Sequence, residues 1–210
     1  MKFLYLAEGQ HDLNFLNITL GQNYSFELSK IKLYCNEGVK TEKAMNESLL
    51  IRRLMGECSP YDTLIKAEEG KRNLFSLLGK ICIPTAQNNQ NLNLTTVFDH
   101  DGKEPNRDFD AIFNTVRRTH PQLTFKLIFD RKISDCQHVD VGHTASYSIL
   151  KINGEKKVEL NKIHFFCFFE SLEQIIRRKY GRNVSIDEGI YKLCECLKGI
   201  EFLPGLNPSR

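Results

Sequence analysis

Three apolar segments of the chain stop abruptly at an acidic residue, and this feature limits the fold more than any other. Residues 2–7 run into Glu8, residues 94–98 run into Asp99, and residues 163–169 run into Glu170. Apolar segments of this length are typical of strands that are buried on both faces of a parallel sheet. Because a helical pattern follows each acidic residue, the repeated order of strand, turn and helix predicts an α/β fold.

The rest of the pattern predicts a single domain of this class. The 210 residues show neither an internal repeat nor a clear linker, so we expect one domain with a mostly parallel sheet flanked by helices. Residues 134–143 are polar and are expected to be irregular. Further strands are expected at 26–35, 62–67, 123–129, 146–152 and 157–160, and helices at 11–20, 41–56, 72–81, 108–118, 172–180 and after Ser185.

Composition excludes several classes of protein. Hydrophobic residues make up 41% and charged residues 26% of the chain, close to globular averages, so disorder is not expected. The net charge of +3 is too small to predict a surface that coats nucleic acid by charge alone. Seven scattered cysteines are typical of reduced thiols in the cytosol. No secretory or membrane-spanning segment is visible, so we expect a cytoplasmic protein without a membrane partner.

The acidic residues at the strand ends predict a metal site. In an open parallel sheet, the carboxyl ends of the strands meet at one edge, where ligands bind. Clustered carboxylates repel one another unless a cation neutralises them, and Mg²⁺ or Mn²⁺ suits oxygen ligands of this kind. Asp99 and Asp101 are two residues apart, so on a strand both side chains would point the same way. Gly102 behind this pair, and Gly9 after Glu8, allow the chain to turn sharply.

Two segments resemble the signature motifs of the TOPRIM domain. Residues 4–12, an apolar strand followed by Glu-Gly-Gln-His-Asp, are similar to its first motif, E-G-x-x-D. Residues 96–102, which end in Asp-His-Asp-Gly, are similar to its second motif, D-x-D-G. The resemblance implies that Glu8 is a general acid/base or a metal ligand, and that the two aspartates of the second motif bind Mg²⁺. Asp12 either shares the catalytic role or only suits the helix dipole.

The resemblance covers about residues 1–130 as a motif-bearing core and leaves about 131–210 as a C-terminal extension of the same domain. Small stand-alone TOPRIM-like proteins, including nucleases of the overcoming-lysogenisation-defect type, are more similar than topoisomerases, and some are linked to phage defence. Several of these proteins end with a strand, an acid and a helix. This similarity implies that Glu170, or Glu173 instead, is a third acid on the metal side.

Basic residues and histidines beside the acids are secondary candidates. Lys71 and Arg72 lie at a predicted helix start, where the dipole does not explain them, so contact with a phosphate or a carboxylate is an alternative to solvent exposure. His11 and His100 flank the acids, and each is either an exposed loop residue or a group that contacts phosphate or moves a proton. Four potential zinc ligands within residues 136–143 match no standard zinc spacing.

These features lead to one expected function and two alternatives. We expect a Mg²⁺- or Mn²⁺-dependent phosphodiesterase, specifically a nuclease that acts on DNA or RNA. A haloacid-dehalogenase-like phosphatase is an alternative because residues 98–102 also fit its D-x-D-G strand end, although Lys103 replaces the usual hydroxyl residue. The other alternative is a non-catalytic or degenerate TOPRIM metal-binding module that works with a partner ATPase. Because the sequence lacks a G-x-x-x-x-G-K-[ST] phosphate loop, any use of ATP would come from that partner. The sequence leaves open whether the chain forms a homodimer.

Overall fold

The computed structural model describes residues 2–21, 63–87, 92–119, 121, 123–153 and 156–204. Within these ranges the chain forms a six-stranded mixed sheet and five helices, which confirms the α/β fold class. The strands are β1 (Lys2–Ala7), β2 (Thr63–Ala67), β3 (Leu92–Asp99), β4 (Leu123–Ser134), β5 (Asp140–Asn153) and β6 (Lys156–Phe168). The helices are α1 (Gln10–Gly21), α4 (Lys71–Gln87), α5 (Pro105–Thr119), α6 (Leu172–Tyr180) and α7 (Ile186–Leu197). The expected strand at 26–35 and the expected helix at 41–56 lie outside the described residues.

The sheet has the strand order β2-β1-β3-β6-β5-β4. The strands β2, β1, β3 and β6 run parallel to one another, as expected. β5 and β4 extend the sheet in antiparallel pairing. The segments at 157–160 and 163–169, expected as separate strands, form the single strand β6 up to Phe168, and the expected irregular segment 134–143 contributes residues to β4 and β5. The apolar pattern divides β6 because the polar residues Asn161 and Lys162 lie between its two halves.

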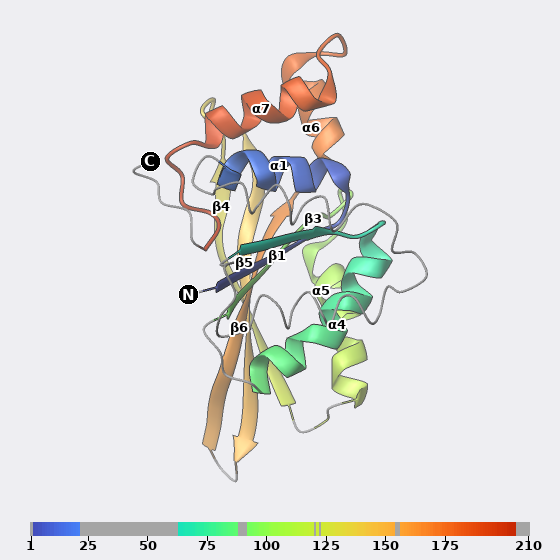
Figure 1. Cartoon of the computed structure of the whole chain (residues 1–210), viewed down its shortest axis with the longest axis vertical. Helices are drawn as coiled ribbons and strands as arrows, with labels where there is room; N and C mark the ends of the chain where they lie inside the picture. The colour runs from blue at the N-terminus through green and yellow to red at the C-terminus, as the bar shows by residue number, and fades with distance from the viewer. Residues whose placement is uncertain are drawn as a thin grey trace.

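Side-chain alternation in the central strands divides the core into two layers. Leu4 and Leu6 of β1 pack in the layer beneath α4 and α5, whereas Tyr5 and Ala7 pack in the layer beneath α1, α6 and α7. Figure 1 shows the two helical groups on opposite sides of the sheet. The fold is therefore a helix–sheet–helix sandwich in which both faces of β1 are buried.

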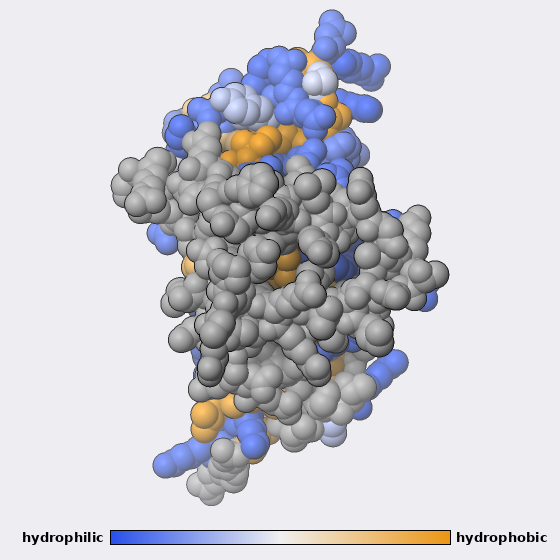
Figure 2. All heavy atoms as spheres, in the orientation of Figure 1, coloured by the Kyte–Doolittle hydropathy of each residue, from blue (hydrophilic) through white to orange (hydrophobic). Residues whose placement is uncertain are grey.

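Serine residues cap the two C-terminal helices. Ser171 forms a capping box with Gln174 at the start of α6. Ser185 accepts a hydrogen bond of 3.2 Å from the backbone amide of Glu188, which confirms its predicted role as the cap of α7. In Figure 2 the outer surface of these helices is mostly hydrophilic. Among the described helices, none has the length and apolar composition needed to cross a membrane.

The neighbouring strands β1 and β3 lead to helices on opposite faces of the sheet. β1 continues into α1 in one layer, and β3 continues through residues 100–104 into α5 in the other. In open α/β sheets, ligands bind outside the carboxyl ends of strands at such a change of direction. The topology therefore selects the ends of β1 and β3 as the place for a site, and these ends are the ones that carry Glu8 and Asp99.

Candidate metal centre at the carboxyl edge of the sheet

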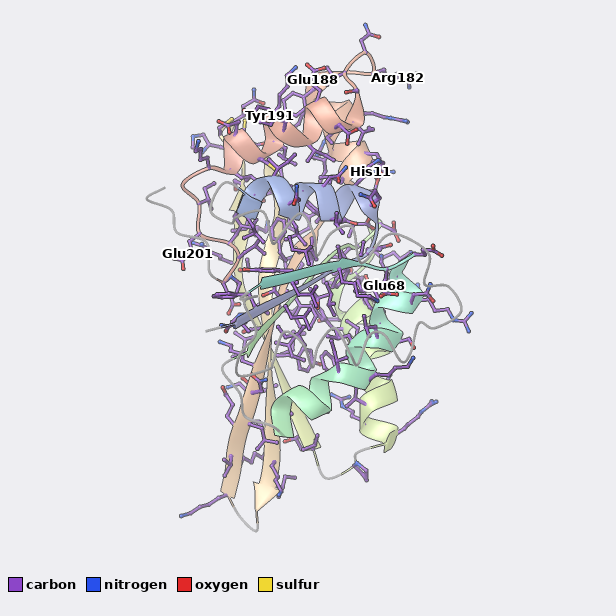
Figure 3. The ribbon with its side chains drawn as sticks, in the orientation of Figure 1. His11, Glu68, Arg182, Glu188, Tyr191 and Glu201 are labelled. Atoms are coloured by element: carbon purple, nitrogen blue, oxygen red, sulfur yellow. The ribbon has the colours of Figure 1, made fainter. Side chains whose placement is uncertain are left out.

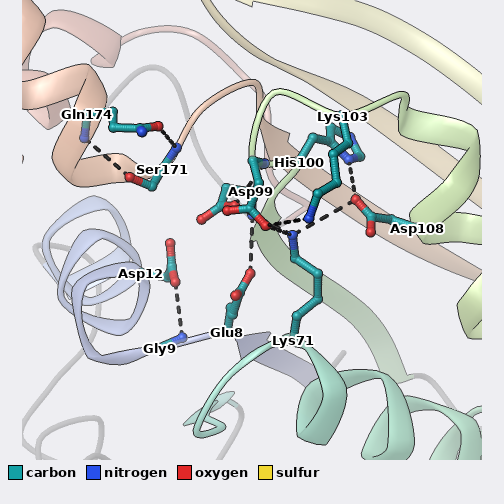
Figure 4. Close-up of polar contacts among 11 residues, drawn as sticks. Glu8, Gly9, Asp12, Lys71, Asp99, His100, Lys103, Asp108, Ser171 and Gln174 are labelled. Carbon is teal, nitrogen blue, oxygen red and sulfur yellow. Dashed lines mark hydrogen bonds and ion pairs between the residues drawn. The ribbon is translucent and has the colours of Figure 1, made fainter.

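Glu8 and Asp99 lie side by side because the pairing of β1 with β3 continues to the ends of the strands. The backbone amide of Glu8 donates a hydrogen bond to the carbonyl of Val97 at 3.1 Å. In return, the Glu8 carboxylate lies 3.5 Å from the backbone amide of Asp99 (Figure 4). The two predicted acids of the first and second motifs are thus brought together at the edge of the sheet.

Asp101 reaches the same place through a turn. β3 ends at Asp99, and Asp101 and Gly102 have positive φ angles of 50° and 68°. The Asp99 carboxylate accepts a hydrogen bond of 3.1 Å from the Asp101 backbone amide, and the Gly102 amide donates to the carbonyl of Phe169 at 3.0 Å. We predicted from strand alternation that the two aspartates point the same way. The strand ends at Asp99, however, and a left-handed turn at Asp101 sets the position of its side chain.

Lys71 at the start of α4 lies among these carboxylates. Its Nζ atom lies 3.0 Å from Oδ2 of Asp101, 3.5 Å from Oδ1 of Asp99 and 4.0 Å from Oδ2 of Asp108. Lys103 adds a second ammonium group 3.5 Å from Asp101. Lys71 was predicted to contact a phosphate or a carboxylate, and in this structure its ammonium group contacts the carboxylates and balances the charge of the acidic cluster (Figure 4).

The acids remain short of positive charge despite this contact. Burial and the charge of Asp99 raise the pKa of Glu8 to about 7. Burial and hydrogen bonding with Asp101 raise the pKa of Asp99 to about 6. Asp101 behaves oppositely, since its hydrogen bond with Asp99 and its contact with Lys71 lower its pKa to about 2. A cation bound beside Glu8 and Asp99 would favour their charged forms and so lower both pKa values, against the effects of burial and mutual repulsion.

Asp12 contributes a fourth carboxylate from the first turn of α1. Its Oδ2 atom accepts a hydrogen bond of 3.0 Å from the backbone amide of Gly9, so it satisfies an amide at the start of the helix. Burial, together with the charges of Glu8 and Asp99, raises its pKa well above the ordinary value. The residue therefore both stabilises the turn after Glu8 and belongs electrostatically to the cluster.

The two candidate acids after β6 differ in their surroundings. Glu170 pairs with Arg178 of α6 at 3.3 Å. Glu173 forms an ion pair with His11 at the beginning of α1, and its charge is among those that raise the pKa of Asp12. Figure 3 shows His11 on the side of α1 that faces α6. Glu173 is therefore coupled to the acidic cluster through α1, whereas Glu170 contacts Arg178 of α6.

Arg72 and His100 have unequal access to a ligand. Arg72 is exposed on the first turn of α4. His100 is only 1% exposed, so it is not the solvent-exposed loop residue of one interpretation. Its Nδ1 atom lies 2.9 Å from Asp108 and its Nε2 atom lies 3.5 Å from Nε2 of His143 on β5. Burial and the neighbouring His100 lower the pKa of His143 to about 4, which keeps that imidazole neutral at pH 7.

The grouping of His100 with His143 was missed at the sequence level. Cys167 of β6 lies in the same buried group, and the three residues come from three separate strands or strand ends. The sequence contains a signal for their common face, since His143 and Cys167 each fall in step with the buried positions of their strand. The pairing partner of each strand cannot be read from that signal.

The chain matches no protein-family model, no curated protein and no solved structure. The resemblance to the TOPRIM domain therefore rests on the two motifs alone.

Proposed function

We propose that the chain is a Mg²⁺-dependent phosphodiesterase of the TOPRIM type that cleaves DNA or RNA. One observation carries this proposal: the carboxylates of Glu8, Asp99 and Asp101 meet where β1 and β3 lead to opposite faces of the sheet. This is the arrangement that the two sequence motifs led us to expect. It places hard oxygen ligands at the one edge where the topology favours a ligand.

The donor set fits a divalent cation. All the ligating atoms are carboxylate oxygens, which Mg²⁺ and Mn²⁺ prefer over nitrogen or sulfur. The ammonium group of Lys71 already lies 3.0 Å from Asp101 and 3.5 Å from Asp99, so positive charge is stabilised at this point. Asp99 and Asp101 would hold the ion, which leaves Glu8 beside them as the acid or base. When bound, Mg²⁺ polarises a phosphoryl oxygen and lowers the pKa of a bound water molecule.

Glu8 is the residue best suited to move a proton. Its pKa of about 7 lies near neutral pH, where a general acid or base works best. Asp12 holds the amide of Gly9 and so fixes the turn that directs the Glu8 side chain. The ammonium groups of Lys71 and Lys103 lie within reach of a phosphate bound next to Asp101.

Cleavage assays with matched variants test the proposal. We expect the purified protein to cut supercoiled plasmid, single-stranded DNA or RNA with Mg²⁺ or Mn²⁺, and Asp99→Asn and Glu8→Gln to be slower by at least about 100-fold. Asp110→Asn is the control, because it makes the same change at an exposed position on α5. The electron paramagnetic resonance spectrum of Mn²⁺ measures its binding to the protein. We expect this binding to be weaker in Asp99→Asn and unchanged in the control.

Three results would contradict the proposal. Equal cleavage by wild type and Asp99→Asn would mean that the activity does not come from this site. Mn²⁺ binding without cleavage of any nucleic acid would favour the alternative of a metal-binding module that needs a partner ATPase. Hydrolysis of a small phosphate monoester in place of nucleic acid would favour the haloacid-dehalogenase-like alternative.

A further inference from the structure

A second group of metal-binding side chains lies directly beneath the acidic loop. His143 of β5 pairs with Cys167 of β6, and Cys167 pairs on its other side with Phe98 of β3. Residues paired across a sheet share a face, and His100 follows Phe98 by two positions on that same face. The ligating atoms of His100, His143 and Cys167 all lie within 4.8 Å of one another, and all three side chains are buried.

The spacing of the two imidazoles suits a shared ion. Nε2 of His100 lies 3.5 Å from Nε2 of His143, which is at the outer limit for a direct hydrogen bond. Two nitrogens bound to one tetrahedral zinc, each at about 2.0–2.1 Å, lie about 3.3 Å apart. A small inward movement of either ring would therefore convert this contact into a pair of ligands.

The surroundings prepare His100 as a ligand. Its Nδ1 atom lies 2.9 Å from the Asp108 carboxylate, which favours the tautomer with the proton on Nδ1 and leaves the Nε2 lone pair available for a ligand bond. Metal-bound histidines in proteins usually have such a carboxylate partner on the other ring nitrogen. The ring centroids of Phe129 and Phe169 lie 5.3 and 5.5 Å from that of His143. This apolar wall disfavours a hydrated hard ion such as Mg²⁺ and suits a partly desolvated softer one.

We propose that His100, His143 and Cys167 bind one Zn²⁺ ion that anchors the loop carrying Asp99 and Asp101. Zinc in proteins is bound by imidazole nitrogens and thiolate sulfurs, and a site with three protein ligands leaves the fourth position to a water molecule. On binding, the thiol proton of Cys167 passes to solvent and the sulfur donates its electron pair to the metal, with no change of oxidation state. The consequence is structural, since the ligand His100 lies between the two aspartates.

The zinc site can be tested separately from the proposed phosphodiesterase activity. Its ligands are nitrogen and sulfur atoms on the buried side of the loop, whereas the proposed magnesium ligands are oxygens at the edge of the sheet. A spectroscopic signal that requires a thiolate therefore reports on this site alone. Asp99→Asn should leave that signal in place even if it abolishes Mn²⁺ binding.

Cobalt substitution tests the zinc site. The purified full chain is treated with a chelator, reloaded with Co²⁺ and read by absorption, where we expect visible bands of tetrahedral Co²⁺ and a near-ultraviolet band from thiolate to cobalt. One equivalent of Zn²⁺ should displace the cobalt and remove both. Cys167→Ala should lose the thiolate band. Asp108→Asn removes the charge beside Nδ1 of His100, together with a 4.0 Å contact to Lys71, and should weaken Co²⁺ binding about 10-fold or more. Cys194→Ala is the control, as a buried cysteine in the opposite layer.

The wild-type spectrum alone can overturn the proposal. A chain that binds no Co²⁺ through a thiolate would show that His100 and His143 are only a hydrogen-bonded pair in the core. A band that persists in Cys167→Ala, or that disappears in Cys194→Ala while the protein stays folded, would assign the metal to another cysteine. If Cys167→Ala does not fold by circular dichroism, His143→Gln provides the second variant, and retention of the full wild-type spectrum there would also overturn the assignment.

Discussion

Lys71 is the residue on which the charge balance of the carboxyl edge depends. Its ammonium group contacts Asp99 and Asp101 in this structure, and a divalent cation between those carboxylates would compete with it. We expect Lys71→Met to lower the free energy of unfolding without divalent metal by about 1 kcal/mol, since Asp101 is partly exposed and water screens the repulsion. Urea unfolding with a chelator measures this loss.

Magnesium should stabilise the Lys71→Met variant more than the wild type. An ion that binds only the folded state adds stability that grows with the logarithm of its affinity, and removal of the competing ammonium raises that affinity. Arg72→Met is the control, because Arg72 is exposed at the next position and should change stability by less than about 0.5 kcal/mol. Equal stabilisation of the wild type and the Lys71→Met variant by Mg²⁺ would argue against a metal site beside Lys71.

Single residues of the site differ in how far the sequence could reveal them. Glu8 and Asp99 were predictable because each ends an apolar segment, and parallel strands end at one edge. The role of Lys71 was not, since it depends on how α4 lies against the end of β3. His143 and Cys167 meet only through the register of β5 with β6, which local patterns do not determine.

The packing of α6 against α7 depends on one position without a side chain. A Cβ atom added to Gly189 of α7 would lie 2.2 Å from Cγ2 of Ile176, a fully buried residue of α6. Alanine normally favours a helix over glycine by about 1 kcal/mol, but this overlap should reverse the sign. We expect Gly189→Ala to lower the free energy of unfolding by about 1–3 kcal/mol, measured by urea denaturation.

Gly79 of α4 offers the matched control for that substitution. A Cβ atom there would lie 3.7 Å from Cγ2 of Val116, an ordinary contact distance. Gly79→Ala should therefore leave stability unchanged or raise it by up to about 1 kcal/mol. If the two alanine variants are equally stable, the close approach of α6 and α7 does not constrain position 189.

A buried ion pair ties the end of α6 to the turn between β4 and β5. The side chains of Lys179 and Asp135 form this pair, and both are almost fully buried. Removal of one partner leaves an uncompensated charge, so Lys179→Met should cost about 3 kcal/mol in thermal or urea unfolding. Lys192→Met is the control, because its pair with Glu188 is exposed and should contribute about 0.5 kcal/mol or less.

The same ion pair gives the protein a component of acid sensitivity. Burial alone would raise the pKa of Asp135, but hydrogen bonds from Lys179 and from two backbone amides outweigh it and lower the pKa below 3.8. The unfolded chain therefore binds a proton more readily than the folded one, so stability is present above about pH 4 and is lost as the pH falls through the folded-state pKa. Unfolding measured from pH 6 to pH 3 should show a shallower loss in Asp135→Asn. An identical pH profile would contradict this.

Elements with local start and stop signals were the easiest to predict. α6 and α7 begin where Ser171 and Ser185 supply cap oxygens, and their apolar stripes meet in one layer of the core. β6 was divided in two because polar residues near its middle interrupt the apolar run, although the backbone continues to pair with β5 on both sides of them. Pairing of exposed strand ends depends on the partner strand, which hydropathy does not reveal.

At the scale of the molecule, a strand from the last third of the chain lies inside the sheet. β6 lies between β3 and β5, so it pairs directly with the strand that carries Asp99. Apolar runs could predict that such a strand exists and is buried, but the strand order arises from long-range packing. The motif-bearing residues up to about 130 therefore pair in the sheet with β6, a neighbour that the motifs do not predict.

Truncation tests whether those neighbours are required for folding. A chain that ends at Ser134 lacks β5, β6, α6 and α7, which removes the only sheet partner of β4 among the described strands. It also removes α6 and α7 from the layer in which Tyr5 and α1 pack, and leaves β3 as an apolar edge. We expect this fragment to aggregate or to unfold without a cooperative transition by circular dichroism, whereas a chain that ends at Pro204 keeps every described element and should unfold like the full protein. A monomeric 1–134 fragment with a cooperative transition would show that the motif-bearing part folds without β6, and that the pairing of β3 with β6 serves the site rather than the fold.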